Sequence, residues 1–310
     1  MKANVTPKDA KMTKTFSVEN HKESLLPSDK KWSLVWNDEF DGTTLDTDKW
    51  DFRTYFWGKL SPTFLDNGEG VELTGQSTVR LNMIKKDGNF FSPHMQTGSL
   101  TYDLPKDSDG FWPFGTYRKP KFMHKFGYYE IRCRLPKNDG WHAAFWLQSP
   151  SIGAHPDPRQ CGVECDIIEN YPMAKEGTVC CGCGWNGYGK DSKWFGHFAF
   201  PVGEGIDGDG WHYYGVDWSE KGYIFYADGM EVGRQMEPEC PASNVEQFIL
   251  ISTECHGYNR SFSTDTTDGE ATLAGDANTW NGKPVPELFD AVLPDFFEVD
   301  FVRVYDQVKQ

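Results

Sequence analysis

The sequence predicts an all-β protein, a sandwich or barrel of antiparallel strands, and three observations support this. From Trp32 onward, short runs of apolar residues recur, and several of them alternate apolar with polar positions. Gly, Asp, Asn and Pro separate these runs, as is usual between antiparallel strands. No segment of about 12 residues or more shows the spacing of an amphipathic helix. Together these features favour a sandwich over alternating βαβ units.

The strands can be placed in chain order from their own patterns. Asp228-Gly229 lies between two such runs and predicts the turn of a β-hairpin, since this dipeptide readily adopts positive φ angles. The polar stretch 258–286 is expected to be a loop excursion that shapes the surface. Strands are expected within 71–84, 126–135, 141–150, 163–170, 212–218, 222–235, 247–253 and 296–306.

The length of the chain and the strand-like runs that begin at Trp32 predict one catalytic domain over residues 32–310. A solvated leader is expected over residues 1–31. The leader has no apolar h-region and does not read as a signal peptide. We expect a protein that is secreted, or held at the cell surface or in the periplasm, with its signal removed. A cytoplasmic location stays open because of the eight cysteines.

Charge and composition narrow the class of partner. The formal net charge of −15 argues against nucleic acid and anionic membrane surfaces, which both select for lysine and arginine. No apolar run is long enough for a transmembrane helix. Aromatic residues make up 15% of the chain, which suits stacking on sugar rings or a thick aromatic core. We expect a monomer whose partner is neutral or cationic.

The eight cysteines are expected to be reduced and packed in the interior, where a free thiol behaves as a small apolar side chain. The cluster CCGC at 180–183 lacks the second cysteine pair that a zinc site normally uses. We therefore expect no metal there.

The stretch VECDIIEN at 163–170 carries three acids in one strand-like run. Strand alternation puts Glu164 and Asp166 on one face and Glu169 on the other, where its carboxylate would be buried at high cost. A β-bulge that absorbs one isoleucine would return Glu169 to the shared face. Repulsion among three such acids should raise the pKa of at least one of them.

Two carboxyl groups close together on one face suit a retaining glycosidase, in which one is the nucleophile and the other the acid and then the base. The alternative is a solvated acidic strand face, which is common in antiparallel sheets.

Motifs along the chain resemble those of glycoside hydrolase family 16, in its laminarinase-like, bulge-containing branch. VECDIIEN is similar to the ExDxxE signature of that family. GYYEIRCRLPKNDGWHAAFWL resembles its YGYFEARIKLP-(G)-LWPAFWL segment. The opening WSLVWNDEFDGTTLDTDKW, the central WHYYGVDWSEKGYIFYADGMEV and the closing FFEVDFVRVYD also resemble family segments, in the expected order.

The resemblance implies a β-jelly-roll sandwich of two antiparallel sheets with a concave substrate cleft. It implies Glu164 as nucleophile, Glu169 as acid/base and Asp166 as the residue that maintains their protonation states. The substrate-binding residues are then expected to be Trp141, His142, Cys180 and Trp185, with Cys180 in place of a family histidine. Trp146 is expected in the core.

The resemblance also implies a structural calcium ion held by Glu39, Asp300 and the carbonyl of Gly75, with no cofactor in the chemistry itself. The implied activity is endo-hydrolysis of β-1,3- or mixed-linkage glucan. The alternatives are the same mechanism on a β-galactan such as agar, porphyran, a galactan or a mucin-type glycan, a transglycosylase, and a carbohydrate-binding jelly roll without catalysis. Exo action also stays open.

Overall fold

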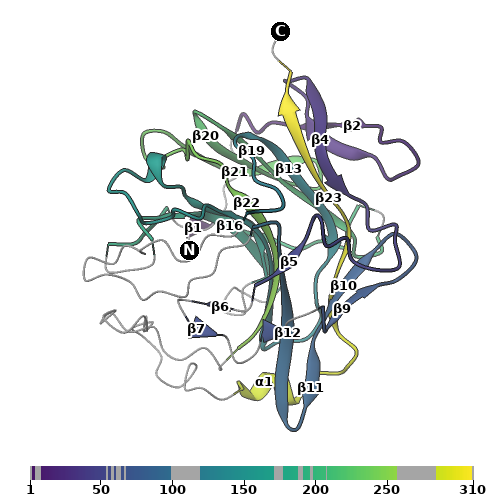
Figure 1. Cartoon of the computed structure of the whole chain (residues 1–310). Coiled ribbons are helices and arrows are strands. Elements are labelled where there is room, and N and C mark those ends of the chain that lie inside the picture. Colours follow the sequence, from purple (N-terminus) through teal and green to yellow (C-terminus); the bar gives the residue numbers. More distant parts are fainter. Residues whose placement is uncertain are drawn as a thin grey trace.

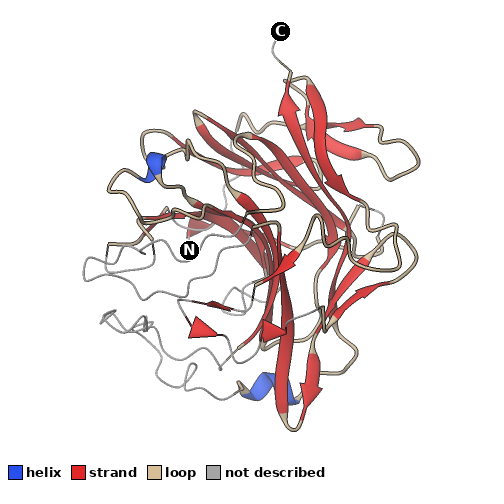
Figure 2. Ribbon diagram, in the orientation of Figure 1, coloured by secondary structure: helices blue, strands red, loops and turns tan. Residues whose placement is uncertain are grey.

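Two large β-sheets pack face to face, and within the part of the chain that the structure describes, helix is confined to two short segments (Figure 2). This computed structural model describes residues 2–3, 8–53, 55–56, 59–60, 64–65, 68–98, 119–170, 177–187, 191–195, 198–206, 208–256 and 284–308. The predicted loop at 258–286 lies outside these residues, apart from its last three positions.

The larger sheet contains the acidic strand near its middle (Figure 1). It is antiparallel except where β1 pairs with β18 and β8 with β12. Its main path runs through β1 (Lys2–Ala3), β18 (Phe198–Pro201), β16 (Thr178–Trp185), β15 (Glu164–Glu169), β14 (Trp141–Gln148), β22 (Phe248–Cys255), β12 (Asn89–Gln96) and β11 (Ile84–Lys86). Three shorter strands pair at its sides, β17 (Lys193–Trp194), β5 (Asp51–Phe52) and β8 (Phe64–Leu65).

The smaller sheet is antiparallel and covers the other side of the core. Its path is β21 (Met230–Met236), β20 (Gly222–Ala227), β19 (His212–Ser219), β13 (Gly127–Arg134), β23 (Phe296–Gln307), β10 (Val79–Asn82) and β9 (Val71–Leu73), with β4 (Trp32–Asp38) paired to β23. The remaining elements are the ribbons β2 (Thr13–Phe16) with β3 (Ser24–Pro27) and β6 (Tyr55–Phe56) with β7 (Lys59–Leu60), the 3₁₀ helix η1 (Pro158–Gln160) and α1 (Pro286–Phe289).

The predicted sandwich of two antiparallel sheets and the predicted strands are confirmed. The hairpin turn between β20 and β21 is also confirmed, because Asp228 and Gly229 have φ angles of 47° and 85°. Alternate side chains of both sheets meet in one core, among them Phe145, Val216 and Val304. All eight cysteines are buried and free, as expected. Among the described residues, no helix is long and apolar enough to span a membrane.

The described part of the leader differs from the prediction of a solvated segment. β2 and β3 form a ribbon that packs on the outer face of the smaller sheet, where Leu26 is fully buried beside Tyr128 and Tyr305. The Leu25 amide donates to Glu130 Oε1 at 2.7 Å. The apolar residues of SLLP (24–27) therefore complete a second, smaller hydrophobic cluster. The polar composition of the rest of the leader gave no indication of it.

Candidate active site

A β-bulge interrupts the acidic strand at the position that the sequence predicts. Glu169 pairs with Ala144 and Asp166 pairs with Trp146, so β15 has two residues between these partners where β14 has one, Phe145. Phe145 pairs with Ile168, which makes Ile167 the extra residue. Both isoleucines enter the core, and the three acids share the opposite face of the sheet. The bulge prediction is confirmed.

Residues just after the bulge fix its register. The Asn170 amide donates to the Ala143 carbonyl at 3.1 Å, and the Ala143 amide donates back to the Asn170 side chain. These bonds hold the end of β15 against β14, so Glu169 keeps its place opposite Ala144. We call the face of the larger sheet that carries Glu164, Asp166 and Glu169 the acidic face.

Asp166 lies between the two glutamates and is 3% exposed. Burial, and then the charges of Glu169 and Glu164, raise its pKa well above the usual value for aspartate. The predicted pKa rise among the three acids is therefore confirmed at Asp166. A raised pKa favours the protonated form of the middle carboxyl, which can donate a hydrogen bond, whereas an ionised carboxylate could only accept one.

Cys180 pairs with Glu169 across β15 and β16 and lies on the acidic face, as expected. Burial, and then the charge of Glu169, raise the pKa of its thiol to about 11. The thiol is neutral at physiological pH and is unsuited to act as a nucleophile there. It presents a small, uncharged surface beside Glu169.

His142 also lies on the acidic face, as expected, and its Nε2 is 3.3 Å from Glu169 Oε1. Burial lowers the pKa of His142, but the bond to Glu169 and the charge of Glu254 leave it above the usual value. Glu254 is the cross-strand partner of His142 on β22. The ring of His256 lies 5.8 Å away, and burial lowers its pKa to about 3, so His256 is neutral.

Two of the expected substrate-binding residues, Trp141 and Trp185, face the other way. Trp141 is 1% exposed, packs with Cys255 and Leu288, and donates from Nε1 to Asp295 Oδ2 at 3.2 Å. Trp185 packs against the main core. Their positions follow from strand parity, since Trp141 is five residues from Trp146 and Trp185 is five from Cys180.

Trp146 was expected in the core, but it lies on the acidic face as the register partner of Asp166. Its Nε1 donates to Ser252 Oγ at 2.9 Å. The His94 ring lies edge-on to it, with centroids 5.8 Å apart, and the Arg53 guanidinium is 5.5 Å from its ring centroid. Trp146 thus anchors a polar patch beside the acids. Strand parity alone could not have predicted this position, because it depends on how β14 pairs with β15.

The sequence of this chain also matches the model of a known protein family. The model for glycosyl hydrolases family 16 matches residues 67–253, more than half of the chain. The chain belongs to glycosyl hydrolase family 16. The expected family is therefore confirmed.

Family 16 relatives differ in their named activities. The chain is 27% identical over 290 residues to glucan endo-1,3-beta-glucosidase A1 of Niallia circulans, covering 89% of this chain and 38% of that protein. It is 30% identical over 155 residues to beta-porphyranase D of Zobellia galactanivorans, covering 49% of this chain and 33% of that protein. The chain thus spans only 33% to 38% of the length of these curated relatives.

The family 16 fold is matched by solved structures. The catalytic domain of an endo-1,3-beta-glucanase (laminarinase) from Thermotoga petrophila RKU-1 superposes with a TM-score of 0.60 at 20% identity, covering 90% of this chain and 100% of that one. This similarity supports the jelly-roll architecture.

The calcium ligands expected from family 16 already have cationic partners. Both carboxylate oxygens of Glu39 accept from the Arg303 guanidinium, at 2.9 and 2.7 Å, and Asp300 Oδ2 accepts from Arg132 Nη1 at 2.6 Å. Gly75 lies in the turn after β9. Within the described residues, no group of three or more His, Cys, Asp or Glu side chains could hold a metal ion. This arrangement does not fit a calcium ion, because each carboxylate would first have to leave its arginine.

Proposed function

We propose that this chain is a retaining endo-β-glycanase that cleaves a neutral β-linked glucan, with β-1,3- or mixed-linkage glucan as its substrate class. The observation that supports this most directly is the bulge at Ile167, which brings Glu164, Asp166 and Glu169 onto one face. A structural sheet gains nothing from three adjacent acids there, because their repulsion destabilises the fold.

Each acid has a role that its surroundings suit. Glu164 is the nucleophile that attacks the anomeric carbon and forms the glycosyl-enzyme intermediate. Glu169 protonates the leaving oxygen and then removes a proton from the attacking water. Asp166 shares the face with both glutamates, and its raised pKa favours the protonated form, which can donate a hydrogen bond to the ionised nucleophile and so keep the two glutamates in different protonation states.

The choice of substrate rests on charge and on one relative. The net charge of −15 and the acidic face disfavour sulfated polymers. The relative that matches 89% of this chain is named a glucan endo-1,3-beta-glucosidase, which favours β-1,3-glucan. Beta-porphyranase D matches about half of the chain, so a β-galactan is the second candidate. A polymer substrate also favours a location outside the cell or at its surface.

A panel of neutral and sulfated polysaccharides, with product lengths followed over time, tests the proposal. A ladder of oligosaccharides from β-1,3-glucan is the expected result, and activity on a galactan alone would replace the substrate class. Sugar acceptors added to the reaction would reveal a transglycosylase through products longer than the substrate.

The roles of the two glutamates can be separated with an activated aryl glycoside. Glu164→Gln should lower kcat roughly 100-fold or more on every substrate, because no intermediate forms. Glu169→Gln should do so on the polymer but spare formation of the intermediate from the aryl glycoside, whose leaving group needs no proton. The exposed Glu72→Gln is the matched control. Unchanged turnover in Glu164→Gln would remove Glu164 from the mechanism, whereas a wild-type chain that binds polysaccharides and cleaves none would be a carbohydrate-binding protein.

A further inference from the structure

An exposed tryptophan lies on the acidic face, on the side of β15 away from β14. Trp194 on β17 is the register partner of Gly184 on β16, and Gly184 is the register partner of Glu164. Antiparallel partners place their side chains on the same face, so the three positions form a row across the sheet. Strand spacing puts Trp194 and Glu164 about 10 Å apart along this row, roughly two strand widths.

Gly184 makes room for this tryptophan. A Cβ atom at Gly184 would lie 2.7 Å from Cε3 and Cζ3 of Trp194 and 2.8 Å from its Cδ2. The six-membered ring therefore lies directly over the Gly184 backbone. The φ angle of Gly184 is outside the left-handed region, so the backbone itself does not call for glycine. What requires glycine at this position is the ring above it.

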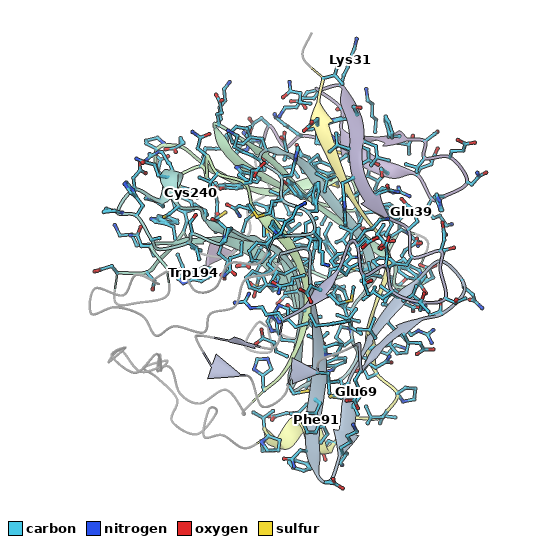
Figure 3. The ribbon with its side chains drawn as sticks, in the orientation of Figure 1. Lys31, Glu39, Glu69, Phe91, Trp194 and Cys240 are labelled. Carbon is cyan, nitrogen blue, oxygen red and sulfur yellow. The ribbon has the colours of Figure 1, made fainter. Side chains whose placement is uncertain are left out.

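One side of the Trp194 ring is covered by β16, yet the residue is still 44% exposed. Figure 3 labels Trp194 at the side of the molecule opposite Glu39, which places it well away from the Glu39–Arg303 pair. A large apolar ring held flat against a strand, in a residue this exposed, offers surface on which a ligand can stack. The neighbouring Trp185, by contrast, is partly buried and packs against the main core.

We propose that Trp194 is a sugar-stacking platform, which binds a neutral glycan unit on the β16 side of Glu164. The flat ring fits the apolar C–H face of a pyranose, and the nearby acids disfavour an anionic unit. The Gly184–Trp194 pair extends the acidic face beyond the reacting unit and gives longer chains additional contact area. This inference rests on the function proposed above and specifies one of its binding subsites.

Binding of β-1,3-linked glucose oligosaccharides of increasing length, measured by calorimetry in a Glu164→Gln background, tests the platform. Trp194→Ala should weaken binding of the longer oligosaccharides roughly tenfold, equivalent to about 1.4 kcal/mol, and leave short ones unchanged. Trp194→Tyr keeps a flat ring and should retain most of the affinity. Gly184→Ala keeps the tryptophan but displaces its ring, so it should behave like Trp194→Ala. Phe289→Ala is the matched control, since Phe289 is an exposed aromatic on α1.

The outcomes separate the platform from the proposed reaction. If the wild-type chain cleaves glucan and Trp194→Ala binds long oligosaccharides as the parent does, the platform is wrong and the reaction stands. If the wild type cleaves nothing but Trp194→Ala still loses affinity, the reaction is wrong and the platform stands. Equal loss for short and long ligands, together with a lower Tm, would show a structural tryptophan and overturn the platform. Absence of binding to any neutral β-glucan or β-galactan would overturn it too.

Discussion

His142 Nε2 and Glu169 Oε1 lie 3.3 Å apart, with side chains only 10% and 15% exposed. At this distance an imidazole and a carboxyl titrate as a pair, and the last proton they lose belongs to both. The pKa of His142 is raised through Glu169 and Glu254 despite burial, so the pair keeps a proton above the usual histidine range. Of the other groups that face the pair, His256 and Cys180 are neutral at that pH, and the raised pKa of Asp166 favours its neutral form.

Replacing His142 should therefore alter the pH dependence of the reaction. In His142→Asn, the alkaline limb of kcat/KM should move to lower pH, because the proton needed on Glu169 no longer has the imidazole to hold it. A pH profile on a soluble β-glucan measures the shift. His155→Asn, at an exposed histidine, should leave the limb in place. An unchanged limb in His142→Asn would remove His142 from the proton transfer.

Asp166→Asn should stabilise the fold and slow the reaction. The unfolded chain ionises this group near 3.8, whereas the folded chain holds its proton to a much higher pH. Between these two pKa values the folded state binds more protons than the unfolded state, so the free energy of unfolding falls as pH rises. Asparagine has no proton to lose in this range, so the variant does not lose this stability. We expect a higher Tm at pH 7 and a kcat reduced roughly 10- to 100-fold, because the amide of asparagine can donate a hydrogen bond but cannot take up or release a proton during the reaction. A lower Tm at pH 7 would mean that Asp166 is ionised in the folded protein.

Replacing Trp141 or Trp146 by phenylalanine should have different effects, on stability for Trp141 and on KM for Trp146. Trp141→Phe loses the bond to Asp295 and should cost about 1 kcal/mol of unfolding free energy without changing KM. Trp146→Phe loses the bond to Ser252 on the acidic face and should raise KM. Urea denaturation and steady-state kinetics on both variants check the pair. A raised KM in Trp141→Phe would contradict its placement in the core.

Glu130 should make the stability of the fold depend on pH. Burial raises its pKa to about 7, against the opposing hydrogen bonds from Ser24 and Leu25. The folded state keeps this proton up to about pH 7, while the unfolded state loses it near 4.5, so the unfolding free energy falls between these values. The slope is up to about 1.4 kcal/mol per pH unit. Glu130→Gln should remove this component in urea denaturation across the window, and exposed Glu72→Gln should not.

Local patterns predicted the strands and the bulge because both depend on neighbours in the chain. The period of two assigns a face to every residue, and three acids on one strand made an extra residue necessary at 167 or 168. The same counting from Cys180 places Trp185 on the core face. For Trp141 and Trp146 it requires only that they lie on opposite faces, and the expected assignment of the two was reversed. The β14–β15 register, in which Trp146 pairs with Asp166, is what decides between them.

Long-range contacts could not be read in this way. Trp194 lies over Gly184 because of the β16–β17 register, and Glu254 lies beside His142 because of the β14–β22 register. Neither register follows from the composition of one strand. The burial of Ser24 and Leu26 likewise depends on a sheet face formed by residues more than a hundred positions away.

The N-terminal ribbon of β2 and β3 limits how far this enzyme can be truncated for expression. The sequence motifs begin at Trp32, which makes that residue a tempting start for recombinant expression. Such a truncation would strip the Lys22 carbonyl and the Ser24 hydroxyl from Arg303, at 2.8 and 2.7 Å, and the Leu25 amide from Glu130. Cloning boundaries for this enzyme should therefore be set ahead of Lys11, whose amide donates to Glu231 and ties the segment to β21.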